Sequence, residues 1–288
     1  MNKITAIIKS LRPKHWIKNM FVFPALIFAA QFTDWQAVFL TISAFFSFCF
    51  ASSSMYLLND VLDYEADRNH PLKKNRPIAA GELSKPVALF ISFLLGIGAI
   101  AISIVINPLF LLVVLAYVLN NILYSYYFKH VVIIDILMVA FGFVLRAIGG
   151  AIAIDVTISP WFLAITFLLT LFLAIMKRRQ EIMEISKNGG KKRKVLENYT
   201  KEMLDQMANI MIPAVMVSYV FYTFNTFHTQ LFVFTIPLVI YGIFRYLYLV
   251  HKKDLGESPT ETLLKDFPLA FVVILWGLMS MFLIYYFE

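Results

Sequence analysis

The segment from residue 59 to residue 71 contains the densest group of side chains that could carry out chemistry. Within it, Asn59, Asp63 and Asp67 follow one another at intervals of four residues. An α-helix turns by about 100° per residue, so side chains four residues apart drift by only about 40° and share a face. Oxygen-bearing side chains on one face suit a hard cation, and Mg²⁺ prefers a few carboxylates together with waters and substrate phosphates. The spacing therefore predicts a Mg²⁺ site formed by these three residues, which makes them the candidate catalytic centre as well.

Two other carboxylates in this segment receive a different interpretation. Asp60 is one residue out of step, so we expect it to point elsewhere, and we expect Glu65 to face solvent. The alternative for the whole segment is a solvated helix end that happens to be acidic. We favour the metal site, because polar oxygens stacked at the rim of a membrane are costly unless they serve a purpose.

Basic residues follow the acidic segment directly, namely Lys73, Lys74 and Arg76. A cation site beside Lys and Arg is what a diphosphate-bearing substrate needs, since the metal bridges phosphate oxygens and the basic side chains neutralise the remaining charge. The alternative is that these residues only mark the side of the membrane on which the loop lies. Lys73 and Arg76 are thus candidate substrate-binding residues.

A second charged group lies at residues 177–181, which read Lys-Arg-Arg-Gln-Glu. If the preceding helix continues, Lys177 and Glu181 are one turn apart and can pair on its surface. Cations clustered at a helix end can bind phosphate, and they can equally anchor the helix to anionic lipid. Both interpretations stay open for Lys177 and Arg178.

Ionisable residues also occur where the chain is otherwise apolar. Asp135 and Arg146 share one apolar stretch, and Tyr124 adds a polar group near the end of the stretch before it. An ionisable side chain inside a membrane is costly and usually lines a cavity or finds a partner. Arg146 is the deeper of the two and therefore the stronger indication of a cavity. Lys14 or Lys18, near the membrane entrance, can meet the phosphate of an arriving lipid, whereas Trp16 between them is more simply an interfacial anchor.

The elements that position these residues are expected to be membrane-spanning helices. Of the 288 residues, 60% are hydrophobic and 15% are charged, with a mean hydropathy of +0.75, whereas soluble domains carry about 25% charged residues. A spanning helix needs about 20 mostly apolar residues, and nine stretches meet this criterion. They fall near residues 17–33, 36–58, 86–106, 108–127, 131–154, 160–176, 207–226, 230–250 and 267–287. The first is the weakest, because Lys18, Asn19 and Pro24 interrupt it.

The basic residues set the expected orientation of these spans. All but two of the 25 Lys and Arg residues lie before the first span, at its start, or in connections on one side, and the exceptions, Arg146 and Arg245, lie inside spans. Because cytoplasmic loops carry an excess of Lys and Arg, we expect the N-terminus and the active site to be cytoplasmic. The C-terminus is then expected outside the plasma (inner) membrane. The net charge of +7 therefore reflects the orientation of the chain in the membrane, and we expect no nucleic-acid partner.

We expect one domain over residues 1–288, an all-α bundle around a central cavity. Two connections, 59–85 and 177–206, are long enough to form a cytoplasmic cap over that cavity. Residues 4–11 place apolar side chains at helical spacing between basic ones, which predicts a short amphipathic helix on the membrane surface.

Nine spans, with Asn59-Asp60-x-x-Asp63-x-x-x-Asp67 after the second, resemble the UbiA-type intramembrane prenyltransferase superfamily over essentially the whole chain. Members of that family use such a motif to hold Mg²⁺ against a diphosphate, and most carry a second aspartate-rich motif after the sixth span. Residues 177–181 occupy that place here and contain no Asp pair.

The chain is more similar to one branch of this family, the decaprenyl-phosphate phosphoribosyltransferases. The resemblance implies transfer of a 5-phosphoribosyl group from phosphoribosyl pyrophosphate to a polyprenyl phosphate, with release of pyrophosphate and with Mg²⁺ as cofactor. The matching text is Arg12-Pro13-x-x-Trp16-x-Lys18-Asn19, Asp67-Arg68-x-His70-Pro71, Lys73-x-x-Arg76-Pro77, Lys177-Arg178-x-x-Glu181 and Tyr199. Together with the polar residues inside the spans, this text gives the candidate substrate-binding residues Lys18, Arg68, Lys73, Arg76, Tyr124, Arg146, Lys177, Arg178 and Glu181.

Two other functions remain open alternatives. The first is transfer of a prenyl group from a prenyl diphosphate to an aromatic or other lipid-soluble acceptor, which the missing second acidic motif disfavours. The second is transport of a lipid phosphate. Transporters usually place broken helices and polar groups near the bilayer midplane, whereas the polar residues here gather at one rim. Membrane lipids are expected partners in every case, and the sequence leaves prenyl chain length and oligomeric state open.

Overall fold

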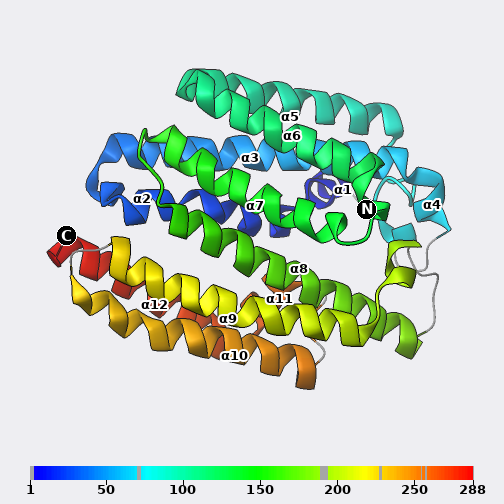
Figure 1. The fold of residues 1–288 in the computed structure, drawn as a ribbon. Helices are drawn as coiled ribbons and strands as arrows, with labels where there is room; N and C mark the ends of the chain where they lie inside the picture. The colour runs from blue at the N-terminus through cyan, green and yellow to red at the C-terminus, as the bar shows by residue number, and fades with distance from the viewer. Residues whose placement is uncertain are drawn as a thin grey trace.

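The computed structural model describes residues 3–69, 73–188, 194–226, 229–253, 255–256 and 258–287, and its regular elements within these ranges are all helical (Figure 1). Eight helices in these ranges, counting η6 and α10 as one, are long and apolar enough to cross a membrane. The long helices are α3 (Trp35–Leu62), α5 (Lys85–Ile106), α6 (Pro108–Tyr126), α7 (Ile134–Ala153), α8 (Pro160–Asn188), α9 (Lys201–Thr226), α10 (Ile236–Lys253) and α12 (Phe267–Phe287). The chain is thus a multi-pass, all-helical membrane protein.

The remaining elements are short and connect or flank the long helices. Four are α-helical: α1 (Lys3–Leu11), α2 (Pro24–Phe28), α4 (Tyr64–Arg68) and α11 (Pro259–Lys265). Six are 3₁₀-helices: η1 (Pro13–Val22), η2 (Gln31–Thr33), η3 (Lys73–Asn75), η4 (Phe128–His130), η5 (Lys194–Asn198) and η6 (Gln230–Thr235). Figure 1 places α4 and the N-terminus at one end of the bundle, called the polar end below, and the C-terminus at the opposite end.

The first expected span, residues 17–33, is the one that differs most from a regular helix. It forms parts of η1, then α2 and η2, and none of these pieces has the length of a spanning helix. Pro24 lacks a backbone N–H and cannot continue a helix, and Ala30 has a φ of 55°, a left-handed conformation that ends helical geometry.

This broken segment nevertheless packs along the bundle. A Cβ atom added to Gly150 in α7 would lie 2.1 Å from the carbonyl oxygen of Val22, so only glycine permits this close approach. Irregular backbone is tolerated at membrane depth where protein covers it. Val22 is fully buried, which agrees with that condition.

The second expected cap connection, residues 177–206, is more helical than a loop. Helix α8 continues through residues 177–181 to Asn188, and α9 begins at Lys201. Residues 189–193 lie outside the described part of the chain. The charged group at residues 177–181 therefore sits on a continuous helix, with side chains fixed by helical geometry.

Candidate active site

A cavity of about 1100 Å³ extends from the polar end into the bundle, with walls formed by α3, α6 and α7 and by α8, α9, α10 and α12. Three residues of α11 also line it, although no pattern in residues 259–265 predicts a role there. All candidate site residues except Arg68 and Glu181 lie on its wall. They are Lys18, Asn59, Asp63, Asp67, Lys73, Arg76, Tyr124, Arg146, Lys177 and Arg178.

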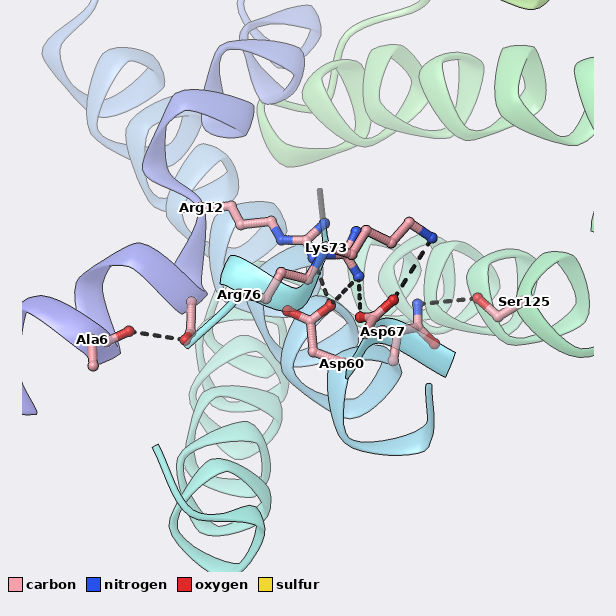
Figure 2. A network of polar contacts seen from close by, with 9 residues as sticks. Ala6, Arg12, Asp60, Asp67, Lys73, Arg76 and Ser125 are labelled. Atoms are coloured by element: carbon pink, nitrogen blue, oxygen red, sulfur yellow. Dashed lines mark hydrogen bonds and ion pairs between the residues drawn. The ribbon is translucent and has the colours of Figure 1, made fainter. Parts of the chain in front are cut away.

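A network of two carboxylates and three cations forms the wall at the polar end (Figure 2). Arg76 Nη1 lies 2.9 Å from Asp60 Oδ1 and 2.6 Å from Asp67 Oδ2. Arg12 Nη2 donates to Asp60 at 2.6 Å, and Lys73 Nζ lies 3.7 Å from Asp67. The two carboxylates are buried, whereas the three basic side chains are 21–30% exposed. The network therefore presents its positive charge outward, toward an incoming anion.

The prediction that Asp60 points elsewhere was wrong. Its side chain is 3% exposed and faces the cavity. Asp60 is on the cavity side because η1 packs along α3 and brings Arg12 to it, across 48 residues of sequence. Glu65 is exposed, as its spacing predicts.

Asn59, Asp63 and Asp67 remain in helical register across the junction of α3 and α4. The Asp63 N–H donates to the Asn59 carbonyl at 2.9 Å, and the Asp67 N–H donates to that of Asp63 at 2.8 Å. Asn59 Nδ2 donates to Ser125 Oγ at 3.1 Å, while the amide oxygen has no hydrogen-bond partner within the described ranges and can act as an acceptor. Asp63 makes no ion pair or side-chain hydrogen bond with any described residue.

The donor set fits a magnesium ion that is shared with a substrate. Within the described ranges, no three His, Cys, Asp or Glu side chains converge closely enough to hold a metal alone. Asp63 and the amide oxygen of Asn59 are available oxygen ligands on the cavity wall, while Asp67 is already bound by Arg76. Because Mg²⁺ commonly takes one or two carboxylates and completes its shell with water and phosphate oxygens, these residues can hold it once a diphosphate is present.

Deeper in the cavity, the groups that hold Arg146 are all neutral among the residues that the structure describes. Its side chain is buried, and it donates to Asn19 Oδ1, to the Gly142 carbonyl and to the Tyr117 hydroxyl, each at 2.7 Å. The guanidinium also lies 4.5 Å from the centre of the Tyr117 ring. Lys18, next to Asn19 in the chain, faces the same cavity. The deep part of the cavity therefore carries positive charge on a rigid support.

Arg178 on α8 has a different environment, because carboxylates neutralise it. Its Nε donates to Asp135 Oδ2 at 2.7 Å, and its Nη1 donates to Glu181 at 2.8 Å. Nη2 donates to the Tyr124 hydroxyl at 3.0 Å. Asp135 is fully buried and also accepts from the Tyr199 hydroxyl at 2.7 Å. Arg178 lies on the cavity wall, but its contacts join α6, α7 and α8 to one another.

Two further candidates can now be placed. Arg68 is exposed and contacts Tyr64, with its guanidinium carbon 5.6 Å from the ring centre, and it does not line the cavity. Lys177 does line it, and its Nζ lies 3.9 Å from Glu181 Oε1. The expected pairing of Lys177 with Glu181 one helical turn away is therefore confirmed.

The part of the cavity farthest from the polar end is aromatic. Phe28, Phe162 and Tyr222 contact one another with ring centres 5.6–6.2 Å apart, and Trp276 packs on Phe28 at 5.9 Å. These rings line the same cavity as the charged residues. One cavity thus joins a charged region to an apolar one, which suits an amphiphile with an anionic head and a hydrocarbon tail.

Comparison with known proteins extends these observations. The UbiA prenyltransferase family pattern matches residues 19–267. A decaprenyl-phosphate phosphoribosyltransferase from Mycolicibacterium smegmatis is 35% identical over 96% of this chain and 91% of its own. One from Corynebacterium glutamicum is also 35% identical, over 96% and 85%. A solved structure, that of a UbiA homolog from Archaeoglobus fulgidus bound to GPP and Mg²⁺, has a TM-score of 0.73 and 20% identity, with 96% of this chain and 99% of that chain covered.

The family pattern covers most of the chain, and the solved homolog shares its fold from end to end. The resemblance first read from the spacing of Asn59, Asp63 and Asp67 is therefore confirmed at the level of the family. The chain belongs to the UbiA prenyltransferase family.

Proposed function

We propose that this protein transfers a 5-phosphoribosyl group from phosphoribosyl pyrophosphate to a polyprenyl phosphate and releases pyrophosphate. The observation that carries the proposal is that one cavity combines the acidic–basic network of the polar end with the deep cations Lys18 and Arg146. Two anionic substrates can be held there at once. The similarity to enzymes with this activity, at 35% identity over nearly the whole chain, supports the choice of reaction.

In this proposal the pyrophosphate of the donor lies at the polar end of the cavity. Asn59 and Asp63, with Asp67 once Arg76 turns to the substrate, would hold Mg²⁺ there, which would supply positive charge to the departing pyrophosphate. Lys73 and Arg76 contact the same group with charge-assisted hydrogen bonds. The bond between ribose C1 and the pyrophosphate oxygen breaks, and the electron pair leaves with the pyrophosphate.

The new bond joins ribose C1 to an oxygen of the lipid phosphate. That oxygen is already anionic, so the step needs no general base. The protein's contribution is to bring two mutually repelling anions together in a fixed geometry, with the positive charge of the wall offsetting their repulsion. The aromatic region beyond Phe28 and Tyr222 receives part of the prenyl chain.

We further propose that residues 13–33 form a ninth crossing and that the whole chain is one domain. Trp16 Nε1 donates to Ser53 Oγ at 3.0 Å, and farther along the segment the ring centres of Phe23 and Phe45 are 5.6 Å apart. The segment therefore runs antiparallel to α3 along its length. A ninth crossing accounts for termini at opposite ends of the bundle (Figure 1). The polar end then faces the cytoplasm, as the distribution of Lys and Arg indicates, with α4, η3 and the end of α8 forming its cap.

The test is a reaction with purified protein. Protein, Mg²⁺, a long-chain polyprenyl phosphate and phosphoribosyl pyrophosphate are incubated, and the lipid product is examined by mass spectrometry. The expected product is the phosphoribosylated lipid, and a chelator is expected to abolish it. Consumption of a prenyl diphosphate with an aromatic acceptor instead would assign the chain to the prenyl-transferring members. Movement of lipid phosphate across vesicles without pyrophosphate release would assign it to transport.

A further inference from the structure

The four arginines on the cavity wall do not share one electrostatic environment. Arg12 pairs with Asp60, Arg76 pairs with Asp60 and Asp67, and Arg178 pairs with Asp135 and Glu181. Arg146 is the exception within the described part of the chain, because its hydrogen bonds go to an amide, a backbone carbonyl and a phenol. Its positive charge is buried, and no carboxylate among the described residues neutralises it.

Lys18 adds a second unneutralised charge to the same place. It lies on the cavity wall and makes no hydrogen bond or ion pair with any described residue. Its neighbour Asn19 accepts the Nε–H of Arg146 at 2.7 Å, which ties the two basic residues to one patch of wall.

Such an arrangement is unfavourable without an anion. A buried charge without a partner is costly because it has lost its hydration and gained no Coulomb attraction in return. The hydrogen bonds to Arg146 fix the direction of its guanidinium but leave its charge in place. Only three of its five N–H groups are used, so donors remain available on the guanidinium.

A polar atom beside this pair also lacks a partner. Asn120 Oδ1 is buried and has no hydrogen-bond partner in the described part of the chain, and the Asn120 side chain lines the cavity. A Cβ built on Gly142 would lie 3.4 Å from Asn120 Nδ2 and 3.6 Å from Arg146 Nη1, so the two side chains flank the same glycine. A hydroxyl on a bound molecule, or a water that accompanies it, would satisfy this acceptor.

We infer that Lys18 and Arg146 form a binding site for a phosphate monoester, separate from the site of the acidic–basic network at the polar end. The inference rests on the proposed function, since both substrates carry such a group: the head of the polyprenyl phosphate and the 5-phosphate of the ribosyl donor. The chemistry of the site is the same for either. Lys18 supplies a mobile ammonium donor, and Arg146 supplies a fixed positive charge behind it.

The test measures binding and therefore does not depend on turnover. Farnesyl phosphate, farnesol and phosphoribosyl pyrophosphate with Mg²⁺ are titrated onto the purified full-length protein and onto Lys18→Met. Lys14→Met is the matched control, because Lys14 is an exposed lysine on the same η1 segment and does not line the cavity. We expect Lys18→Met to weaken binding of a phosphate monoester by about tenfold or more, since a hydrogen bond to a charged group is lost, with farnesol unaffected.

The titrations with the two phosphorylated ligands identify which phosphate monoester binds at the site. Loss of farnesyl phosphate affinity alone assigns it to the lipid head, and loss of phosphoribosyl pyrophosphate affinity alone assigns it to the ribose 5-phosphate. Unchanged affinity for both, or equal losses in Lys14→Met, overturns the inference. Arg146→Lys, checked by its melting temperature, provides a second variant in which the charge is kept and the fixed geometry is lost, and a smaller loss is expected.

The outcomes also separate this inference from the proposed function. If the wild-type protein transfers phosphoribosyl groups but Lys18→Met binds both ligands normally, the function stands and the site is wrong. If the wild-type protein forms no phosphoribosylated lipid but loses monoester binding on Lys18→Met, the site stands and the function is wrong.

Discussion

The ends of α3 and α8 at the polar end are built on opposite charge patterns. The end of α3 and α4 carries carboxylates, and their partners Arg12, Lys73 and Arg76 come from other segments and stay partly exposed. The end of α8 carries cations, and Arg178 is only 5% exposed and is bound to the fully buried Asp135. Both ends line one cavity, but the cations paired with the end of α3 stay partly exposed, whereas Arg178 is enclosed by its carboxylate partners.

The difference separates binding groups from structural ones. A buried ion pair whose hydrogen bonds are complete holds helices in place, and removing one partner leaves an uncompensated charge. A partly exposed network can exchange its internal partners for those of a substrate. We therefore expect changes at the end of α3 to affect the reaction and changes around Arg178 to affect stability. The four predictions below test this division, beginning with the largest effect.

Replacing Asp63 with Ala should reduce transfer by about a hundredfold to a thousandfold, the range found when a group that stabilises developing charge is removed. Asp63 has no side-chain partner among the described residues, so the melting temperature should stay within about 2 °C of wild type. Glu65→Ala is the matched control, an exposed acid in the same segment. Full activity in Asp63→Ala contradicts the metal assignment.

Replacing Asp135 with Ala should lower the free energy of unfolding by about 3 kcal/mol, because Arg178 is left buried with Glu181 as its remaining carboxylate. The measurement is thermal unfolding in detergent. The double variant Asp135→Leu with Arg178→Met should recover most of the loss, since paired apolar replacements of buried ions are often neutral. A double variant that is stable but unable to bind substrate would show that Arg178 is a ligand-binding group.

Replacing Arg76 with Ala should raise the KM for phosphoribosyl pyrophosphate by about tenfold to a hundredfold, as expected for lost hydrogen bonds to a charged group. Arg68→Ala is the comparison, because Arg68 is exposed and does not line the cavity. Steady-state kinetics with varied donor concentration decide between them. Equal effects of both substitutions would mean that the charge of the loop matters and the contacts of Arg76 do not.

Replacing Tyr199 with Phe should lower the free energy of unfolding by about 1–2 kcal/mol, because the Asp135 carboxylate and the Ile133 N–H lose their hydrogen bonds to the hydroxyl. Burial, together with the hydrogen bond to Asp135, raises the pKa of Tyr199 above its ordinary value. The neutral phenol is thus the stabilising form, and its contribution persists below the ordinary tyrosine pKa of about 10 and is lost only above it. The difference in melting temperature between wild type and variant should therefore stay constant from about pH 6 to pH 9, and a decline within that range would contradict the assignment.

Much of the fold could be predicted because its signals are local. Eight of the expected spans correspond to the helices long enough to cross a membrane, and the interruption at Lys18, Asn19 and Pro24 correctly marked residues 17–33 as irregular. The four-residue spacing from Asn59 to Asp67 survived as helical register across a helix junction. Most of the candidate site residues also lie on the wall of one cavity, although their roles stay predictions.

The errors lie where partners are distant in the chain. Asp60 was expected to point elsewhere because it is out of step with the other acidic residues on its own helix. Its partner Arg12 lies on another segment and could not be identified from the local sequence. Arg68 matches a sequence motif and does not line the cavity, so its role in substrate binding stays a prediction. The contribution of α11 to that wall could not be predicted, because a short polar connection carries no pattern that places it against the cavity.

By itself the sequence determined that this protein is a helical membrane protein, and it predicted that the candidate site residues lie near one face. Helical periodicity, apolar length and the placement of Lys and Arg are properties of neighbouring residues, so they can be read without a fold. Only the tertiary structure decided which charges cancel. Arg178 meets Asp135 across 43 residues and Arg146 meets Asn19 across 127. Residues so far apart in the sequence meet only when the helices pack. This packing leaves the charge of Arg146 without a carboxylate partner among the described residues and neutralises that of Arg178.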